Sequence, residues 1–101
     1  MVIVIASARI KAGQRDTFIS LFKEFAESVR QEKGCIEYFP SVDLETGSPI
    51  QDKDPNVVTV IERWESLQDL QTHMQTPEFK AFGEKSAPYT EGMSAKILEA
   101  A

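Results

Sequence analysis

The stretch Val57-Val58-Thr59-Val60-Ile61-Glu62-Arg63-Trp64 predicts the clearest β-strand in this 101-residue chain. Its β-branched and aromatic side chains suit a pleated surface. Side chains alternate between the two faces of a strand, so Val58, Val60, Glu62 and Trp64 share one face. Val57, Thr59, Ile61 and Arg63 share the other. Because both faces are largely apolar, we expect both to be covered.

A strand, a helix and a second strand precede this stretch. Residues 2–10 are rich in Val and Ile, which predicts the first strand. Apolar residues then recur at helical spacing, which predicts a helix over about 14–33 that Gly34 ends. We expect the second strand at about 35–44, with Pro40 at an edge position or a bulge. The polar segment 45–56 is longer than most hairpin loops, so we expect it to have a partner or a function.

Two short helices and a last strand follow the central stretch. Ser66 predicts an N-cap, with Asp69 at the fourth position of a capping-box-like pattern. Thr76-Pro77-Glu78 is typical of a cap, an N1 proline and an acidic residue at the start of another helix. Residues 93–98 predict the last strand.

The order of elements predicts an α+β protein, with one domain spanning residues 1–101. It is the ferredoxin-like β-α-β-β-α-β antiparallel sheet, in which the helices cover one face. The other face should carry residues such as Ile3, Ile5, Val57 or Ile61, whichever parity points away from the helices. An exposed apolar sheet predicts a partner, and a two-fold homodimer with sheet packed on sheet is the simplest solution.

Composition narrows the class of protein. The formal net charge of −5 disfavours a nucleic-acid surface, which needs clustered Lys and Arg. No apolar run approaches the roughly 20 residues of a membrane span. Cys35 is the single cysteine, so no internal disulfide can form, and we expect a cytoplasmic protein. One histidine and no clustered acids predict no metal site, and neither a glycine-rich phosphate loop nor a dinucleotide fingerprint is present.

His73, the only histidine, is one candidate catalytic residue. Its ordinary pKa of about 6.5 suits a base near neutral pH, at the mouth of a pocket between helix and sheet. The alternative is a histidine at the solvent edge, or one that interacts with the carboxyl end of its helix.

Glu62 is the other candidate base, because a carboxylate on an apolar strand face is unusual. Burial would raise its pKa and make it a proton acceptor. The alternatives are a buried salt bridge with Arg9 or Arg63, or exposure at the strand end. Trp64 is either the wall of a flat aromatic pocket or an anchor of the core or of an interface.

Four further aromatic residues are candidate substrate-binding residues. Aromatic side chains at helical or strand spacing more often belong to a core, and only the two tyrosines carry a hydroxyl that could orient a phenol. The four are Tyr38, Phe79, Phe82 and Tyr89, and Phe39 is a further candidate for a pocket wall.

Four segments together carry a family resemblance. They are Lys11-Ala12-Gly13, Gly34-Cys35, Ile61-Glu62-Arg63-Trp64-Glu65-Ser66, and the run from His73 to Phe82. In this order and spacing the chain resembles the antibiotic biosynthesis monooxygenase superfamily of dimeric α+β barrels. The long loop 45–56 and the pair Tyr38…Pro40 are most similar to its quinol monooxygenase branch.

The resemblance implies oxidation of a quinol or similar electron-rich aromatic by molecular oxygen, without flavin, haem or metal. Such a substrate supplies its own electrons once it loses a proton. His73 or Glu62 would be the base, and Trp64 with the other aromatics would form the pocket.

Other branches imply other activities. The haem-degrading branch relies on an Asn, a Trp and a His where this chain has Ala6, His73 and Gly83, so we do not expect haem degradation. The polyketide-oxidising branch often has an Asn in the strand before the Trp, where this chain has Val and Thr. The branch that isomerises a phosphorylated signalling molecule shares the His…Thr-Pro segment and stays open, as does a non-catalytic dimeric quinone-binding module.

Overall fold

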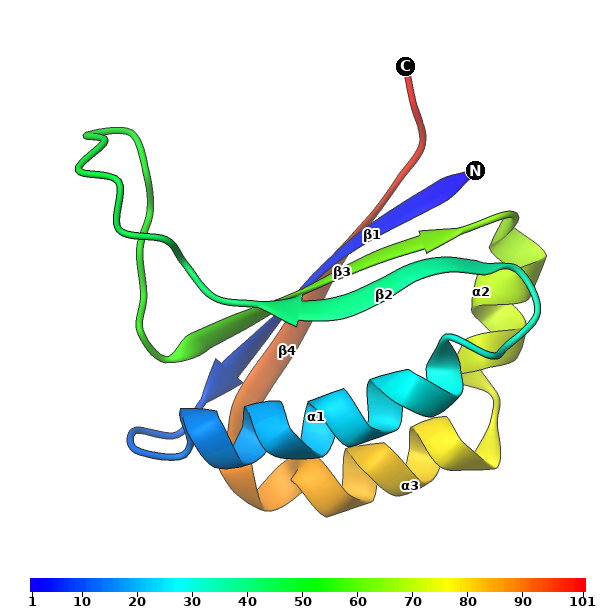
Figure 1. The fold of residues 1–101 in the computed structure, drawn as a ribbon, viewed down its shortest axis with the longest axis horizontal. Helices are drawn as coiled ribbons and strands as arrows, with labels where there is room; N and C mark the ends of the chain where they lie inside the picture. The colour runs from blue at the N-terminus through cyan, green and yellow to red at the C-terminus, as the bar shows by residue number, and fades with distance from the viewer.

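Four antiparallel strands form one sheet in the computed structural model, which describes all residues 1–101 (Figure 1). The strands are β1 (Val2–Ile10), β2 (Cys35–Ser41), β3 (Val57–Trp64) and β4 (Thr90–Leu98). Their order across the sheet is β2-β3-β1-β4, so β3 and β1 occupy the centre. This arrangement confirms the predicted ferredoxin-like α+β fold.

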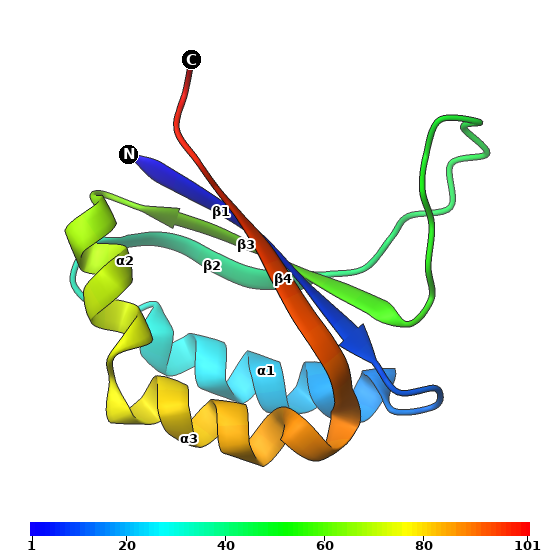
Figure 2. The same ribbon diagram turned by 180° about the vertical axis from the view of Figure 1, so that it is seen from behind.

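Three helices lie on one side of this sheet, as Figures 1 and 2 show from opposite directions. They are α1 (Arg15–Val29), α2 (Leu67–Met74) and α3 (Pro77–Ser86), and a single 3₁₀ turn, η1 (Ala87–Tyr89), leads into β4. The predicted caps form, because the side chains of Ser66 and Thr76 accept hydrogen bonds from the backbone N–H groups of Asp69 and Phe79. None of these helices is both long and apolar enough to cross a membrane.

Three boundaries differ from the sequence-based expectation. The first helix ends at Val29 rather than near residue 33, because three-residue turn hydrogen bonds replace the helical ladder there and Gly34 adopts φ +80°. The second strand ends at Ser41 rather than at residue 44, because Ser41 is the last residue of β2 that pairs with β3. The last strand begins at Thr90, earlier than residue 93, because it already pairs with Ile10 there.

The core lies between the helices and the even-numbered face of the two central strands. Trp64 and Val58 are fully buried, and Phe22 and Ala26 of α1 pack into the same cluster. Rings of α1 and α3 meet directly, because Phe25 and Phe82 stack with centroids 4.5 Å apart. Proline is tolerated at position 40 because β2 is an edge strand, as the sequence predicted.

The opposite face of the sheet has no helix over it. The register aligns Phe39, Ile61 and Ile5 in one row across the three strands β2, β3 and β1. Phe39 is 42% exposed, and Ile5 and Ile61 are partly exposed. The odd-numbered residues of β1 and β3 therefore form the uncovered face, and the even-numbered residues face the helices.

Residues 42–56 form a loop that extends away from the body of the molecule (Figures 1 and 2). It is held by its own contacts, such as the hydrogen bond of 2.9 Å from the backbone N–H of Asp54 to Asp43 Oδ2 and an ion pair between Lys53 and Glu45. Arg15 at the start of α1 donates to the carbonyl of Pro55. The apolar side chains of Leu44 and Ile50 are nevertheless largely exposed.

Candidate functional site

A cavity of about 290 Å³ lies between the helices and the even-numbered face of the sheet. All but three of its lining residues are apolar, and the exceptions are Glu62, His73 and Ser94. The apolar lining residues are Val4, Ala6, Phe22, Tyr38, Val60, Leu70, Met74, Phe79, Phe82, Met93, Ala95 and Ile97. A mostly apolar hollow with a few convergent polar groups is the usual form of a small-molecule site.

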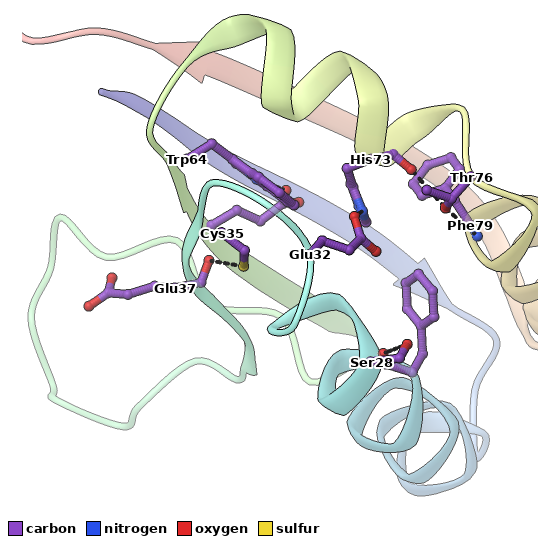
Figure 3. A network of polar contacts seen from close by, with 10 residues as sticks. Ser28, Glu32, Cys35, Glu37, Trp64, His73, Thr76 and Phe79 are labelled. Atoms are coloured by element: carbon purple, nitrogen blue, oxygen red, sulfur yellow. Dashed lines mark hydrogen bonds and ion pairs between the residues drawn. The ribbon is translucent and has the colours of Figure 1, made fainter.

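His73 lies in the last turn of α2, and its side chain is only 1% exposed. Three aromatic rings surround the imidazole. The distances from its centroid to the ring centroids of Trp64, Phe79 and Tyr38 are 4.8, 5.1 and 5.3 Å. Its Nδ1 lies 2.9 Å from Glu32 Oε1, and Figure 3 shows these two side chains pointing toward one another. Its Nε2 is buried and has no hydrogen-bond partner in the protein.

These surroundings set the protonation of His73. Burial lowers the pKa of His73 below its ordinary value, while the hydrogen bond to Glu32 and the negative charge of that residue oppose the shift. A carboxylate can only accept, so the contact is satisfied when Nδ1 carries the hydrogen and donates it to Glu32. Nε2 then keeps its lone pair, which is the form that a general base requires.

Glu62 lines the cavity from β3 and is 7% exposed. It forms no salt bridge with Arg9 or Arg63, because its partner is the indole of Trp64, whose Nε1 donates to Oε1 over 2.9 Å. Burial raises the pKa of Glu62, the hydrogen bond from Trp64 lowers it, and the negative charge of Glu32 raises it. The net shift is upward, which favours a neutral carboxyl that can donate as well as accept.

Tyr38 stacks on Phe22 at 5.4 Å and turns its ring edge-on toward His73. Burial, followed by the negative charges of Glu62 and Glu32, raises the pKa of Tyr38, so its hydroxyl keeps its proton. The same causes raise the pKa of Cys35 to about 11. The thiol is therefore not activated, as the sequence indicated.

The structure brings most of the predicted site residues together. His73, Glu62, Tyr38, Phe79 and Phe82 all line the cavity. Trp64 does not line it: the indole is fully buried and supports Glu62 and His73 from behind. Tyr89 lies in η1 and is likewise absent from the lining, and Phe39 lies on the uncovered face of the sheet.

Comparison with known proteins assigns this chain to a family. The family model described as antibiotic biosynthesis monooxygenase matches residues 1–85. The chain belongs to this family. The probable quinol monooxygenase YgiN of Escherichia coli K12 is 36% identical over 101 residues, which cover 98% of this chain and 97% of that protein.

Solved structures agree with this membership of the antibiotic biosynthesis monooxygenase family. A crystal structure described as antibiotic biosynthesis monooxygenase has a TM-score of 0.82 at 26% identity, covering 100% of this chain and 99% of that one. A chain from Deinococcus radiodurans has a TM-score of 0.84 at 24% identity, with 100% and 93% covered, and shows the same fold.

Sequence reasoning missed Ser94 in the cavity lining and also Glu32, the hydrogen-bond partner of His73. Glu32 lies in the turn after α1, in the part that the sequence predicted as helix, and 41 positions separate it from His73. No pattern in the sequence pairs the two residues. The contact depends on how the end of α1 packs beside α2.

Proposed function

We propose that this protein oxidises a quinol or a similar electron-rich aromatic with molecular oxygen, without a bound cofactor. The observation that carries the proposal is a buried imidazole with an unpartnered Nε2 in the lining of an apolar cavity that a buried carboxyl, Glu62, also lines. The relationship to a probable quinol monooxygenase supports the same substrate class.

Three side chains of the cavity have a role in this reaction. His73 Nε2 removes a proton from one hydroxyl of the quinol, because burial keeps the imidazole neutral. Glu62 and the hydroxyl of Tyr38 hold the ring oxygens by hydrogen bonds, because both groups keep their protons at neutral pH more readily than usual. The apolar walls exclude water, which strengthens these contacts.

The electrons come from the substrate. The quinol anion passes one electron to oxygen, and the resulting semiquinone and superoxide combine at a ring carbon to form a peroxy adduct. When the O–O bond breaks, one oxygen stays on the ring and the other leaves as water, so that quinol plus O₂ gives hydroxyquinone plus H₂O. Oxygen is reduced by four electrons, and the ring supplies all four.

The lining of the cavity disfavours the isomerase alternative. A phosphorylated substrate needs a basic anchor, and neither Lys nor Arg lines the cavity. A non-catalytic quinone-binding module would use the same walls. Measuring whether a bound quinol is oxidised therefore distinguishes an oxidising enzyme from a protein that only binds quinones.

The test supplies reduced menadione anaerobically, admits oxygen, and measures oxygen uptake above autoxidation. We expect an enzyme-dependent rate that His73→Ala lowers on the order of 100-fold or more, since a positioned base contributes that much. Glu62→Gln should lower it less, and Glu84→Gln on the exposed side of α3 is the control. Tight menadione binding without an excess rate would leave a binding module instead.

We also propose that two copies pair through the uncovered face of the sheet. The support is the row of at least partly exposed apolar side chains Phe39, Ile61 and Ile5 on that face, because an exposed apolar sheet favours a partner.

A further inference from the structure

His73 is the only residue that the apolar cavity shares with a neighbouring polar depression. The depression lies on the far side of the ring and is lined also by Glu32, Lys33, Gln68, Asp69, Thr72 and Thr76. Glu32 lines the depression but not the cavity, so it contacts the imidazole from the side that a substrate does not occupy.

The backbone holds Glu32 in a fixed position for this contact. Its N–H donates to the carbonyl of Val29 over 2.9 Å, and its carbonyl accepts from the N–H of Cys35 over 3.2 Å. Its side chain is 22% exposed, whereas that of His73 is 1% exposed. The carboxylate therefore stays partly hydrated while it reaches a buried ring.

We propose that Glu32 is a positioning residue, which holds His73 with Nδ1–H toward the depression and with the Nε2 lone pair free for the ligand in the cavity. The inference rests on the proposed function. When Nε2 takes the proton of a quinol hydroxyl, the substrate O–H bond breaks and an N–H bond forms. The Glu32 carboxylate then stabilises the imidazolium, and the proton returns from Nε2 to the oxygen that leaves as water.

The Nε2 atom of His73, which has no hydrogen-bond partner, also points to a ligand in the cavity. A buried ring nitrogen without a hydrogen-bond partner is unfavourable and uncommon in folded proteins, so this one calls for an explanation. With Nδ1 fixed by Glu32, the ring cannot flip to satisfy Nε2 without losing its one polar contact. A ligand hydroxyl in the cavity would satisfy it.

Other charged and titratable groups surround His73, and they bear on any pH dependence. They are Glu32 and Lys33 after α1, Tyr38 on β2, Glu62 on β3 and Asp69 on α2. Only Glu32 forms a hydrogen bond with the ring. Replacing that one carboxylate thus isolates its effect on the imidazole.

The first test is ¹⁵N NMR of the imidazole, which is unambiguous because the chain has one histidine. At pH 7 the wild type should show a protonated Nδ1 and an unprotonated Nε2. In Glu32→Gln we expect the preference for this tautomer to be lost, whereas the exposed-residue control Glu27→Gln keeps it. An unchanged spectrum in Glu32→Gln, with the domain still folded, would overturn the proposal.

The second test is the pH profile of menadiol oxidation. Glu32→Gln should lower kcat on the order of 10- to 100-fold, because part of the general-base contribution is lost. KM should change little, because Glu32 does not line the cavity. The acid limb should move to lower pH, since the hydrogen bond and charge of Glu32 raise the pKa of His73. Glu32→Asp, which keeps the carboxylate, should recover part of kcat.

The two readouts separate the two proposals. No oxygen uptake by the wild type would remove the oxidation proposal, while the NMR comparison would still decide what Glu32 does to His73. A normal rate and an unshifted acid limb in Glu32→Gln would overturn the positioning role and leave the oxidation proposal in place.

Discussion

Trp64 Nε1 donates a hydrogen bond of 2.9 Å to Glu62 Oε1, and the two residues lie two positions apart on the helix-facing side of β3. The indole is fully buried and is the only protein group that donates to this carboxyl. It therefore acts as the support of a cavity residue. Glu62 lines the cavity, but its hydrogen bond comes from Trp64, which does not line the cavity.

Replacing Trp64 with Phe should destabilise the protein. The variant keeps an aromatic ring but leaves the buried Glu62 carboxyl without its donor, which costs about 1–3 kcal/mol in addition to the lost packing. Urea unfolding of Trp64→Phe, Glu62→Leu and the double variant measures the coupling between the two residues, because leucine removes the acceptor. Strictly additive effects would show that the hydrogen bond contributes nothing.

Glu62→Gln should stabilise the protein increasingly as the pH rises. The pKa of Glu62 is raised in the folded state, so its favourable contribution is complete below the unfolded-state pKa and is lost as the pH rises through the folded-state pKa. Glutamine does not titrate, and its carbonyl still accepts from Trp64. The difference in unfolding free energy between variant and wild type should grow from pH 4 to pH 8. A constant difference would contradict the raised pKa.

His73→Gln should show the opposite pH dependence. The pKa of His73 is lowered in the folded state, so the unfolded chain takes up this proton first. The stabilising contribution is present above the ordinary pKa of about 6.5 and is lost as the pH falls below it. The wild type should therefore lose stability below pH 6.5 relative to His73→Gln. Thermal melts between pH 5 and pH 7.5 measure this, and parallel curves would argue against a buried neutral imidazole.

The sequence was sufficient for the order of elements and for the grouping of side chains on each face of β3. Val58, Val60, Glu62 and Trp64 share one face because successive side chains of a strand alternate, and the structure shows that the helices cover this face. Two side-chain relationships were not predictable. Whether Trp64 lines the cavity or supports it depends on the direction of its ring, which the strand pattern does not fix. The contact of Glu32 with His73 depends on a turn that sequence periodicity assigned to a helix.

Ile61→Lys should break the proposed dimer. Ile61 lies at the centre of the uncovered face, between Phe39 and Ile5, so a charge there would be buried between two copies. Size-exclusion chromatography with light scattering should give a dimer for the wild type and a monomer for the variant. Ala81→Lys, on the exposed side of α3, should stay dimeric. A wild type that is monomeric at micromolar concentration would contradict the proposal.

Gly34→Ala should be more destabilising than Gly13→Ala, although both glycines have φ near +80°. The backbone strain of about 1–2 kcal/mol is common to both substitutions. A Cβ at Gly34 would also overlap the carboxylate of Asp69, whereas nothing lies within 4 Å of one at Gly13. The Asp69→Ala substitution removes this carboxylate and so tests the cause. In that background, Gly34→Ala should lower the free energy of unfolding by no more than Gly13→Ala does. The N-cap of α2 survives that change because Ser66 accepts from the backbone N–H of residue 69. If the excess persists in the Asp69→Ala background, the turn after α1 is strained for another reason.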